Sequence, residues 1–294
     1  MLAPRRVAAA MPTVGLVLKR GAPGAREVAR RVIVRLAERG LRVVAESEEA
    51  AALGCDPVVD KAAMFEIASI IVVLGGDGTF LATARLTGAR SVPVLGVNLG
   101  GLGFLTEVTA EDLAAALDDA LAGRAPIDAR CMLRALVRRP GGGEESYQAL
   151  NDAVLSRGSL GRVIAIDARI DGQPLASFKG DGVIFATPTG STAYALSAGG
   201  PIVHPSVRVF VIAPICPHTL SVRPIVIDDA ARIEFRLTTP NEDMVLTLDG
   251  QQTVAMGPAD VVEISRSPYT ASIVRSTRLG FYDLLRTKLG WART

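Results

Sequence analysis

The chain has 294 residues, of which 49% are hydrophobic, and its formal net charge is +2. This length suits one large domain or two ordinary ones, and so balanced a charge argues against nucleic acid or a membrane surface as a partner. No apolar run approaches the ~20 residues that cross a bilayer, and the opening MLAPRRVAAAMP, with Met11 as an alternative start, lacks the apolar core of a signal peptide.

The first 125 residues alternate between predicted strands and predicted helices. Short runs of apolar and β-branched residues predict buried strands at 13–18, 41–46, 70–74 and 92–97. Apolar residues at helical spacing predict helices over 25–39, 79–87 and 109–123. Such alternation is typical of an open parallel α/β layer, so we expect residues 1–125 to form an α/β domain.

The pattern changes after Pro126. Ile233, Phe235 and Leu237 alternate with charged residues, which predicts a strand with one wet face. Further β-rich runs occur at 163–170, 244–248, 260–265 and 271–275, whereas 191–198 has a helical pattern. We therefore expect an antiparallel β-rich domain over residues 126–275. Residues 276–294 are too apolar for a free tail, and we expect them to pack back on the α/β domain.

Three cysteines, Cys55, Cys131 and Cys216, are present. An odd number without CxxC spacing predicts buried thiols in a reducing compartment. We therefore expect a cytoplasmic protein.

The stretch IVVLGGDGTF, residues 71–80, ends a predicted strand with three glycines around one aspartate. Gly75, Gly76 and Gly78 permit positive φ and let a ligand approach the backbone, and turns from strand to helix favour phosphate. Asp77 would repel phosphate unless it holds Mg²⁺ or faces a hydroxyl that must lose its proton, and both are tasks of phosphoryl transfer. The turn thus predicts a kinase that acts on an alcohol, although a simple helix cap remains the alternative for Asp77. No GxxxxGK[ST] motif is present, which excludes a P-loop enzyme.

Two further segments carry site-like chemistry. NLGGLGFL, residues 98–105, is a second glycine turn after the next strand, so the two turns are expected to line one crevice. The second segment is KGDGVIFATPTGSTAYALSAGGP, residues 179–201. Tyr194 offers an aromatic face, and four hydroxyls could bind a base and ribose: those of Thr187, Thr189, Ser191 and Thr192. The alternatives are a flexible loop for the first segment and a polar turn with a helix cap for the second.

These motifs resemble the NAD kinase family of the bacterial type. GGDGT alone is similar to turns in NAD kinases, in diacylglycerol and sphingosine kinases and, loosely, in phosphofructokinases. The GDGxxxxTPTGSTAYxLSAGGP pattern at 180–201, APICPHTLSVRP at 213–224 and the closing TKLGW are similar to NAD kinases in particular, and the lipid kinases lack TPTGSTAY. The resemblance covers about residues 71 to 291, and the first seventy residues match only in pattern.

The resemblance implies both fold and activity. The implied fold is a Rossmann-like α/β domain followed by an antiparallel β-sandwich, with the site between them. The implied reaction is ATP-dependent phosphorylation of the adenosine-ribose 2′-hydroxyl of NAD to NADP, with Mg²⁺ or another divalent metal. Family members commonly form homo-oligomers, either dimers or tetramers. A lipid kinase, or a non-catalytic NAD(P)-binding sensor, remains the alternative.

In the α/β domain the resemblance assigns the catalytic role to Asp77, as a general base that aligns the 2′-hydroxyl. The residues that flank Asp77 are expected to approach the phosphates: Gly75, Gly76, Gly78 and Thr79. Phe104 is expected to line the adenine pocket. No metal ligand is assigned.

In the β-rich domain, Asn151 and Asp152 stand where the family has an Asn-Glu pair that contacts the riboses, so the acid here is one methylene shorter. The resemblance places four residues in the NAD pocket: Thr189, Thr192, Ala193 and Tyr194. Asp181 is expected to hold the nicotinamide end or contacts of a partner subunit. Lys179 is expected to meet the pyrophosphate or new 2′-phosphate, or else to pair with Asp181. In LDGQ, Asp249 is either a turn acid, which we favour, or a ligand contact.

Overall fold

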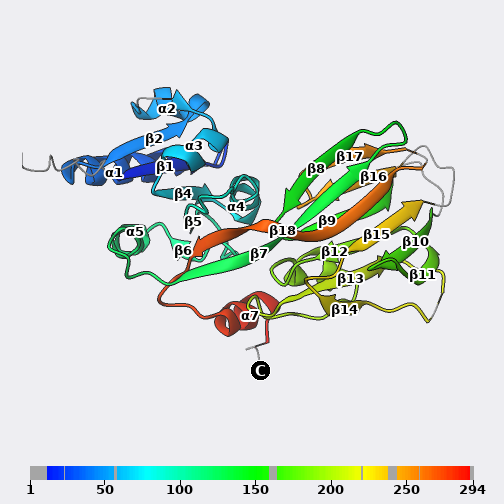
Figure 1. Ribbon diagram of the computed structural model, residues 1–294. Helices are drawn as coiled ribbons and strands as arrows, with labels where there is room; N and C mark the ends of the chain where they lie inside the picture. The colour runs from blue at the N-terminus through cyan, green and yellow to red at the C-terminus, as the bar shows by residue number, and fades with distance from the viewer. Residues whose placement is uncertain are drawn as a thin grey trace, which may run out of the picture. The chain divides into compact units, whose positions relative to one another are not determined.

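The computed structural model describes residues 12–22, 24–55, 58–158, 164–219, 221–237, 244–257 and 259–291. The alternative start at Met11 lies outside these ranges. The chain divides into two compact units (Figure 1). The first unit comprises Met1–Asp128 and Ser272–Thr294, and the second comprises Ala129–Ala271.

The first unit is built on a parallel sheet. Its strands lie in the order β3-β2-β1-β4-β5, and β6 and the end of β18 pair with β5. Their bounds are Thr13–Leu18 (β1), Arg42–Glu46 (β2), Val58–Val59 (β3), Ile70–Gly75 (β4), Val94–Asn98 (β5), Val108–Thr109 (β6) and Val261–Val274 (β18). Every residue of β1 and β4 is buried, as expected for central strands of a parallel sheet covered on both faces.

Six helices of this unit lie within the described residues: α1 (Ala25–Glu38), α2 (Ser47–Leu53), α3 (Lys61–Ile67), α4 (Asp77–Ala84), α5 (Leu113–Leu121) and α7 (Phe281–Leu289). α1 buries Val28, Val32 and Leu36 at helical spacing, and these side chains join the core made by alternate residues of the central strands. The helix predicted from residue 109 begins only at Leu113. Val108 and Thr109 instead pair with β5, and the Thr109 hydroxyl accepts the N–H of Asp112 at 3.2 Å.

The second unit consists of two antiparallel sheets, drawn as the green-to-orange arrows of Figure 1. One has the order β11-β10-β15-β18-β7-β8, and the other has the order β14-β13-β12-β9-β16-β17. The bounds are Ile127–Arg138 (β7), Glu144–Ala149 (β8), Asp152–Arg157 (β9), Ile164–Ile170 (β10), Gln173–Gly180 (β11), Gly182–Ala186 (β12), Val209–Ile215 (β13), Ile225–Asp228 (β14), Ile233–Leu237 (β15), Met244–Leu248 (β16) and Gln252–Met256 (β17).

Inward-facing residues of both sheets form one core, so the second unit is a β-sandwich. Phe185 of β12 and Phe235 of β15 meet across it with ring centroids 4.3 Å apart. Removing either buried ring would cost about 3–5 kcal/mol of folding free energy. The chain therefore combines a parallel α/β unit with an antiparallel β-sandwich, and the predicted fold class is confirmed.

The second sheet is also buried on its outer face. Val154, Ile184 and Val211 on that face pack against Ala195 of the short helix α6 (Tyr194–Ser197) and against Val203. This explains why all five residues of β12 are buried. The TPTGSTAY segment is thereby fixed against strands β9, β12 and β13.

Some sequence predictions for this half were wrong in detail. The runs at 260–265 and 271–275 belong to one continuous strand, β18, because Ser267 and the residues beside it continue the extended backbone. The predicted helix at 191–198 is a 3₁₀ turn over Gly190–Thr192 followed by α6. Cys55 is buried and Cys131 is partly buried, whereas Cys216 is exposed. The prediction of a buried thiol was therefore wrong for Cys216.

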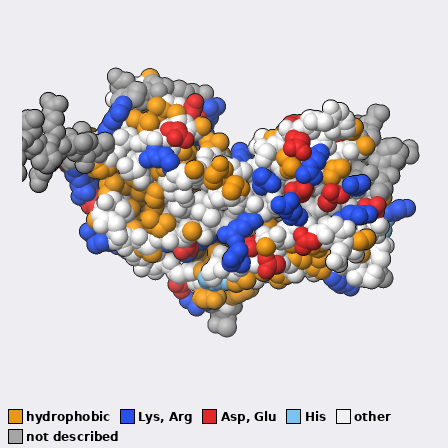
Figure 2. All heavy atoms as spheres, in the orientation of Figure 1, with side chains coloured by type: hydrophobic (Ala, Val, Ile, Leu, Met, Phe, Trp, Pro, Cys, Tyr) orange, Lys and Arg blue, Asp and Glu red, His pale blue; other side chains and the backbone are white. Residues whose placement is uncertain are grey.

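Surface charge fits the balanced composition. Figure 2 shows positive and negative side chains intermixed over the visible face of the second unit. Within the described part of the chain, no helix is long and apolar enough to cross a membrane.

Candidate functional site

The first glycine turn joins β4 to α4. Gly75 ends the strand, Gly76 caps the helix in an extended conformation and Asp77 is the first helical residue. Gly75, Gly76 and Gly78 permit positive φ, but none of them adopts it. What requires glycine at position 75 is space, because a Cβ there would lie 2.8 Å from the Thr79 hydroxyl. At Gly76 an added Cβ would meet no atom within 4 Å, so this backbone is open to a ligand.

The carboxylate of Asp77 accepts four hydrogen bonds from the second glycine turn. The N–H of Phe104 donates to Oδ2 at 2.8 Å, whereas the N–H groups of Leu105 and Thr106 each donate to Oδ1 at 3.0 Å. The Thr106 hydroxyl also donates to Oδ1 at 3.0 Å. A Cβ on Gly103 would lie 2.1 Å from that oxygen. The negative charge of Asp77 is therefore stabilised by hydrogen-bond donors that belong to the same unit.

The two glycine turns lie side by side because β4 and β5 are neighbouring parallel strands with Gly75 opposite Asn98. Asn98 Oδ1 accepts the N–H of Gly100 at 2.7 Å, which shapes the start of the second turn. Farther along this turn, the Phe104 ring lies 5.9 Å from Nζ of Lys288 on α7. Asp77 thus does more than cap a helix, since its side chain holds the neighbouring turn.

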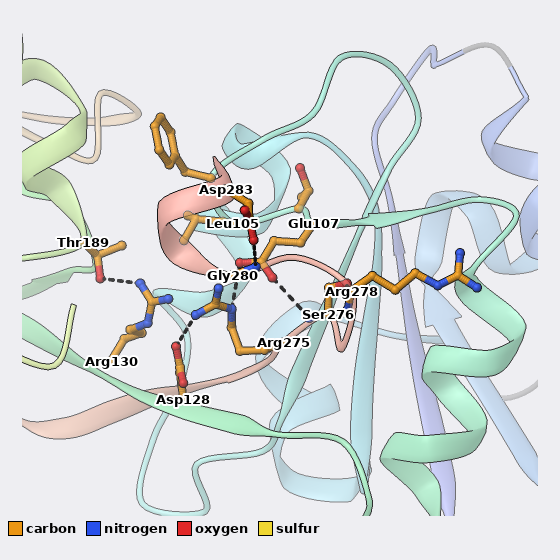
Figure 3. Close-up of polar contacts among 12 residues, drawn as sticks. Leu105, Glu107, Asp128, Arg130, Thr189, Arg275, Ser276, Arg278, Gly280 and Asp283 are labelled. Atoms are coloured by element: carbon orange, nitrogen blue, oxygen red, sulfur yellow. Dashed lines mark hydrogen bonds and ion pairs between the residues drawn. The ribbon is translucent and has the colours of Figure 1, made fainter. Parts of the chain in front are cut away.

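Behind the second turn lies a cluster of charged groups (Figure 3). Glu107, 5% exposed, follows Thr106 directly. Its Oε1 lies 2.7 Å from Nε of Arg275, and its Oε2 accepts the N–H of Ser276 at 3.1 Å. Nη1 of Arg275 donates to Asp128 Oδ2 at 2.5 Å. The sequence reasoning identified none of these residues, because no local pattern links position 107 to position 275.

In the second unit, Asn151 lies in the turn between β8 and β9, and Asp152 is the first residue of β9. The carboxylate of Asp249 accepts the N–H groups of Leu150, Asn151 and Asp152 at 3.1, 2.7 and 3.2 Å. Asp249 lies in the turn after β16 with φ of 51° and is 7% exposed. The preferred interpretation of Asp249 as a turn acid fits this position, and its side chain also fixes the backbone that presents Asn151 and Asp152.

The carbonyl groups of the same turn are held from the other direction. The Thr187 hydroxyl donates to the Leu150 carbonyl at 2.5 Å, and the Thr187 N–H donates to the Asn151 carbonyl at 2.9 Å. Gly190 approaches so closely that a Cβ would lie 2.1 Å from the Asn151 carbonyl oxygen. The TPTG loop and the Asn151–Asp152 turn are therefore built as one rigid unit.

A cavity of about 320 Å³ opens beside this turn. Its lining includes four of the predicted residues: Asn151, Asp152, Ala193 and Tyr194. Burial, and then the negative charge of Asp249, raise the pKa of the Asp152 carboxyl to about 7. Tyr194 is 47% exposed at the same cavity. A group that titrates near neutrality in a cleft marks a candidate binding site.

The hydroxyls of the TPTGSTAY segment divide into two sets. Thr187 and Ser191 are fully buried and bond to backbone, so the expectation that they bind base and ribose was wrong. The Thr192 hydroxyl donates to the Thr189 carbonyl at 3.3 Å. Thr189 Oγ1 accepts a hydrogen bond of 3.3 Å from Arg130, a 4% exposed residue that the sequence did not single out (Figure 3).

Two predicted charged residues lie near the end of β11. The carboxylate of Asp181 forms an ion pair of 2.9 Å with Nε of Arg157. Lys179 is exposed on β11, and the ion-pair partner that the structure shows for Asp181 is Arg157. The structure thus pairs Asp181 with Arg157 and leaves the ammonium group of Lys179 at the surface.

Cavity size alone does not locate the site. A larger cavity, about 570 Å³, lies between α1 and α5 and includes Arg31, Arg35 and Glu111 in its lining. None of the predicted site residues lines it. The convergence of polar groups around Asp77 and around Asp152 is the better guide.

Comparisons with known proteins agree with this geometry. The family model of the ATP-NAD kinase N-terminal domain matches residues 14–125, and that of the C-terminal domain matches residues 150–276. The NAD kinase of Geotalea daltonii is 44% identical over 264 residues, which are 90% of this chain and 93% of that protein. The NAD kinase of Geobacter metallireducens is 42% identical over 281 residues, which are 96% of this chain and 99% of that protein.

Two solved structures share the fold. The crystal structure of yeast NADH kinase complexed with NADH has a TM-score of 0.89 at 26% identity, with 97% of this chain and 89% of that one covered. The structure of an NAD kinase from Archaeoglobus fulgidus in complex with ATP has a TM-score of 0.73 at 25% identity, with 95% and 98% covered.

Proposed function

Since this chain belongs to the NAD kinase family by both family models and by its relatives, we propose how its residues divide the work of that family's reaction. The reaction is the ATP-dependent phosphorylation of NAD. The proposed acceptor is the 2′-hydroxyl of the adenosine ribose, and the proposed product is NADP. The family models and relatives named above favour neither a lipid kinase nor a non-catalytic sensor.

Asp77 is the proposed catalytic residue. Three donors occupy its Oδ1, whereas Oδ2 accepts the N–H of Phe104. A carboxylate oxygen has two lone pairs, so Oδ2 is the atom suited to accept a hydrogen bond from the ribose hydroxyl. A ribose hydroxyl is a weak acid and the transition state of phosphoryl transfer is loose, so Asp77 aligns the attacking oxygen and takes its proton late. The observation that supports this role is that the N–H groups of residues 104–106 fix the Asp77 carboxylate by hydrogen bonds.

The open backbone at Gly76 supports the proposal that this turn approaches the phosphates, together with Gly75, Gly78 and Thr79. Phe104, on the turn that holds Asp77, is the proposed aromatic contact for adenine.

The cavity beside the Asn151–Asp152 turn supports a dinucleotide site in the second unit. Asn151 and Asp152 are the proposed ribose contacts, and Ala193 and Tyr194 the proposed walls. The cavity lining does not include Thr189 and Thr192, whose proposed part is to shape the loop that ends at Ala193. Lys179 is proposed to meet a phosphate, and Asp181 the nicotinamide end or a partner subunit.

Mg²⁺, or another divalent metal, is the proposed cofactor. Within the described residues, no group of three His, Cys, Asp or Glu side chains could hold a metal ion. This fits an ion that takes most of its oxygen ligands from ATP, because Mg²⁺ usually binds one or two carboxylates together with substrate phosphates. No carboxylate is assigned to the ion, because the oxygens of Asp77 are engaged by four donors and the proposed ribose hydroxyl. When bound, the ion would neutralise charge that develops on the transferred phosphoryl group.

We also propose a cytoplasmic homo-oligomer, either a dimer or a tetramer. The cysteines of the chain are all free thiols, including the exposed Cys216, which fits a reducing compartment. Light scattering on the purified protein would test the oligomeric state, and a monomer at working concentration would contradict it.

A coupled assay tests the catalytic proposal. NAD, ATP and Mg²⁺ are supplied, and NADP is detected with a strictly NADP-dependent dehydrogenase. Asp77→Asn is expected to abolish turnover while NAD binding survives, because an amide cannot take the proton. Since the amide would also sit among four donors, thermal unfolding must first show that the variant is folded. Turnover near that of the unmodified enzyme would refute the role.

A further inference from the structure

We propose that Arg275 is a positioning residue for Asp77, acting through Glu107 and the 103–107 loop. This rests on the proposed catalytic role of Asp77. Arg275 immediately follows β18, nearly two hundred residues after Asp77 in the chain, and its side-chain partners are Glu107 and Asp128.

The loop depends on an anchor at its C-terminal end. It presents three consecutive N–H groups, from Phe104 to Thr106, to Asp77. Its internal bond, from the N–H of Gly103 to the Thr106 carbonyl, is long at 3.4 Å. The residue after Thr106 is Glu107, whose carboxylate is buried. The backbone after Glu107 is held by the pairing of Val108 and Thr109 with β5, and the Glu107 side chain supplies the second hold next to the Thr106 donors.

Glu107 is held by Arg275 and its neighbour. Arg275 Nε approaches Oε1 to 2.7 Å as an ion pair, without the alignment of a hydrogen bond. The N–H of Ser276 donates to Oε2 at 3.1 Å. A buried carboxylate is stable only when it is paired, so removal of the guanidinium would force Glu107 to move toward water or to take up a proton. Movement of Glu107 would displace Thr106, the residue before it, and protonation would weaken the hold of the Ser276 N–H on Glu107.

Arg275 is itself fixed from a second direction (Figure 3). Its Nη1 donates to Asp128 at 2.5 Å, and its backbone N–H donates to the Pro126 carbonyl at 2.9 Å. The guanidinium is therefore held between two carboxylates, Glu107 and Asp128, and cannot follow the loop. Arg275 therefore holds Glu107, and with it the end of the loop that orients Asp77, in a fixed position.

The test uses the double variant Glu107→Gln/Arg275→Met, which removes both charges together and leaves no buried ion alone. We expect kcat to fall roughly 10- to 100-fold, because small displacements of a catalytic group carry penalties of that size. The KM for NAD should stay unchanged. Arg275→Lys, which keeps the charge, should recover part of kcat.

Hydrogen exchange measured by mass spectrometry supplies a readout that does not depend on activity. The peptide containing residues 104–106 should exchange faster in the double variant, while peptides from β1 and β4 should not. Uniformly faster exchange with unchanged kcat would show a merely structural pair and overturn the proposal.

A matched control is Arg26→Met/Glu49→Gln, which removes another ion pair of this unit, 2.8 Å long with a largely buried carboxylate. It should leave kcat and the 104–106 peptide unchanged. The two proposals fail separately. Full turnover in Asp77→Asn refutes the catalytic role of Asp77, whereas an inactive Asp77→Asn with normal kcat in the Glu107/Arg275 variant refutes only the positioning role.

Discussion

Asp77 and Thr106 are joined by two hydrogen bonds to the same oxygen. The Thr106 N–H and the Thr106 hydroxyl each donate to Oδ1 of Asp77 at 3.0 Å, across 29 residues of chain. With Leu105 as a third donor, Oδ1 is fully engaged, and the carboxylate plane is fixed. Thr106 therefore decides which oxygen of Asp77 is left to face a substrate.

Thr106→Val should lower kcat because it removes one of these donors. The side chains have similar volume, and a hydrogen bond to a charged group contributes about 1.5–3 kcal/mol. Steady-state kinetics with NAD and ATP would measure the change. Thr106→Ser keeps the hydroxyl and should keep most of the activity, so equal losses in both variants would contradict the assignment.

Gly103→Ala should displace the carboxylate of Asp77. The added Cβ would lie 2.1 Å from Asp77 Oδ1 and 2.4 Å from the Thr106 hydroxyl oxygen, so one of them must move. We expect a fall in kcat of roughly 100-fold and a lower Tm. The control is Gly101→Ala in the same turn, where a Cβ meets nothing within 4 Å. Matching kinetics for the two variants would show that the loop tolerates the clash.

Stability should depend on pH through Asp152. Its pKa is raised from 3.8 to about 7 by burial and by the charge of Asp249. A raised pKa means that the protonated group favours folding, so this contribution is complete below about pH 4 and is lost as the pH rises through about 7.

Comparison with Asp152→Asn isolates this effect, because the amide does not titrate. The Tm of the unmodified protein, relative to this variant, should fall between about pH 4 and about pH 7, with a change in free energy of ~1.4 kcal/mol per unit inside the window. Glu144→Gln, an exposed carboxylate of the same unit, serves as the control. A difference that does not vary with pH would rule out the raised pKa.

Tyr194→Ala should weaken the binding of NAD. The ring lines the cavity beside Asp152 and is half exposed, so its removal takes an apolar contact from a bound nucleotide with little effect on the core. Calorimetry would give the change in Kd. Tyr282→Ala, another exposed aromatic residue, should leave Kd unchanged, and an unchanged Kd in the Tyr194 variant would remove that residue from the site.

The sequence predicted elements well where periodicity reports burial. The helix at α1 and the fully buried strand β4 are examples, because their patterns are local. It failed where a partner distant in the chain decides the structure. Thr109 lies in a helical pattern, yet it pairs with β5. The hydroxyls of Thr187 and Ser191 look free in the sequence, yet the Thr187 hydroxyl donates to the Leu150 carbonyl, 37 residues away. The Ser191 oxygen accepts the N–H of Val203, 12 residues away.

The candidate site shows the same division. Asp77 stands out because a carboxylate is unusual in a glycine turn suited to phosphate, whereas Asn151 and Asp152 are found only through the family resemblance, since Asn and Asp are ordinary turn residues. Asp249 was noticed, but its three backbone bonds reach back 97 to 99 residues. Arg275 gave no signal at all, since a lone arginine after a β-rich run is ordinary.

The return of the chain to its first unit has a consequence for synthesis on the ribosome. β5 pairs on one side with β4, and on the other with Ile273 and Val274 at the end of β18. Until those residues emerge, part of a buried, apolar strand lacks its neighbour, and such an open edge invites pairing between nascent chains. The N-terminal unit, although translated first, is among the last parts of the protein to be completed.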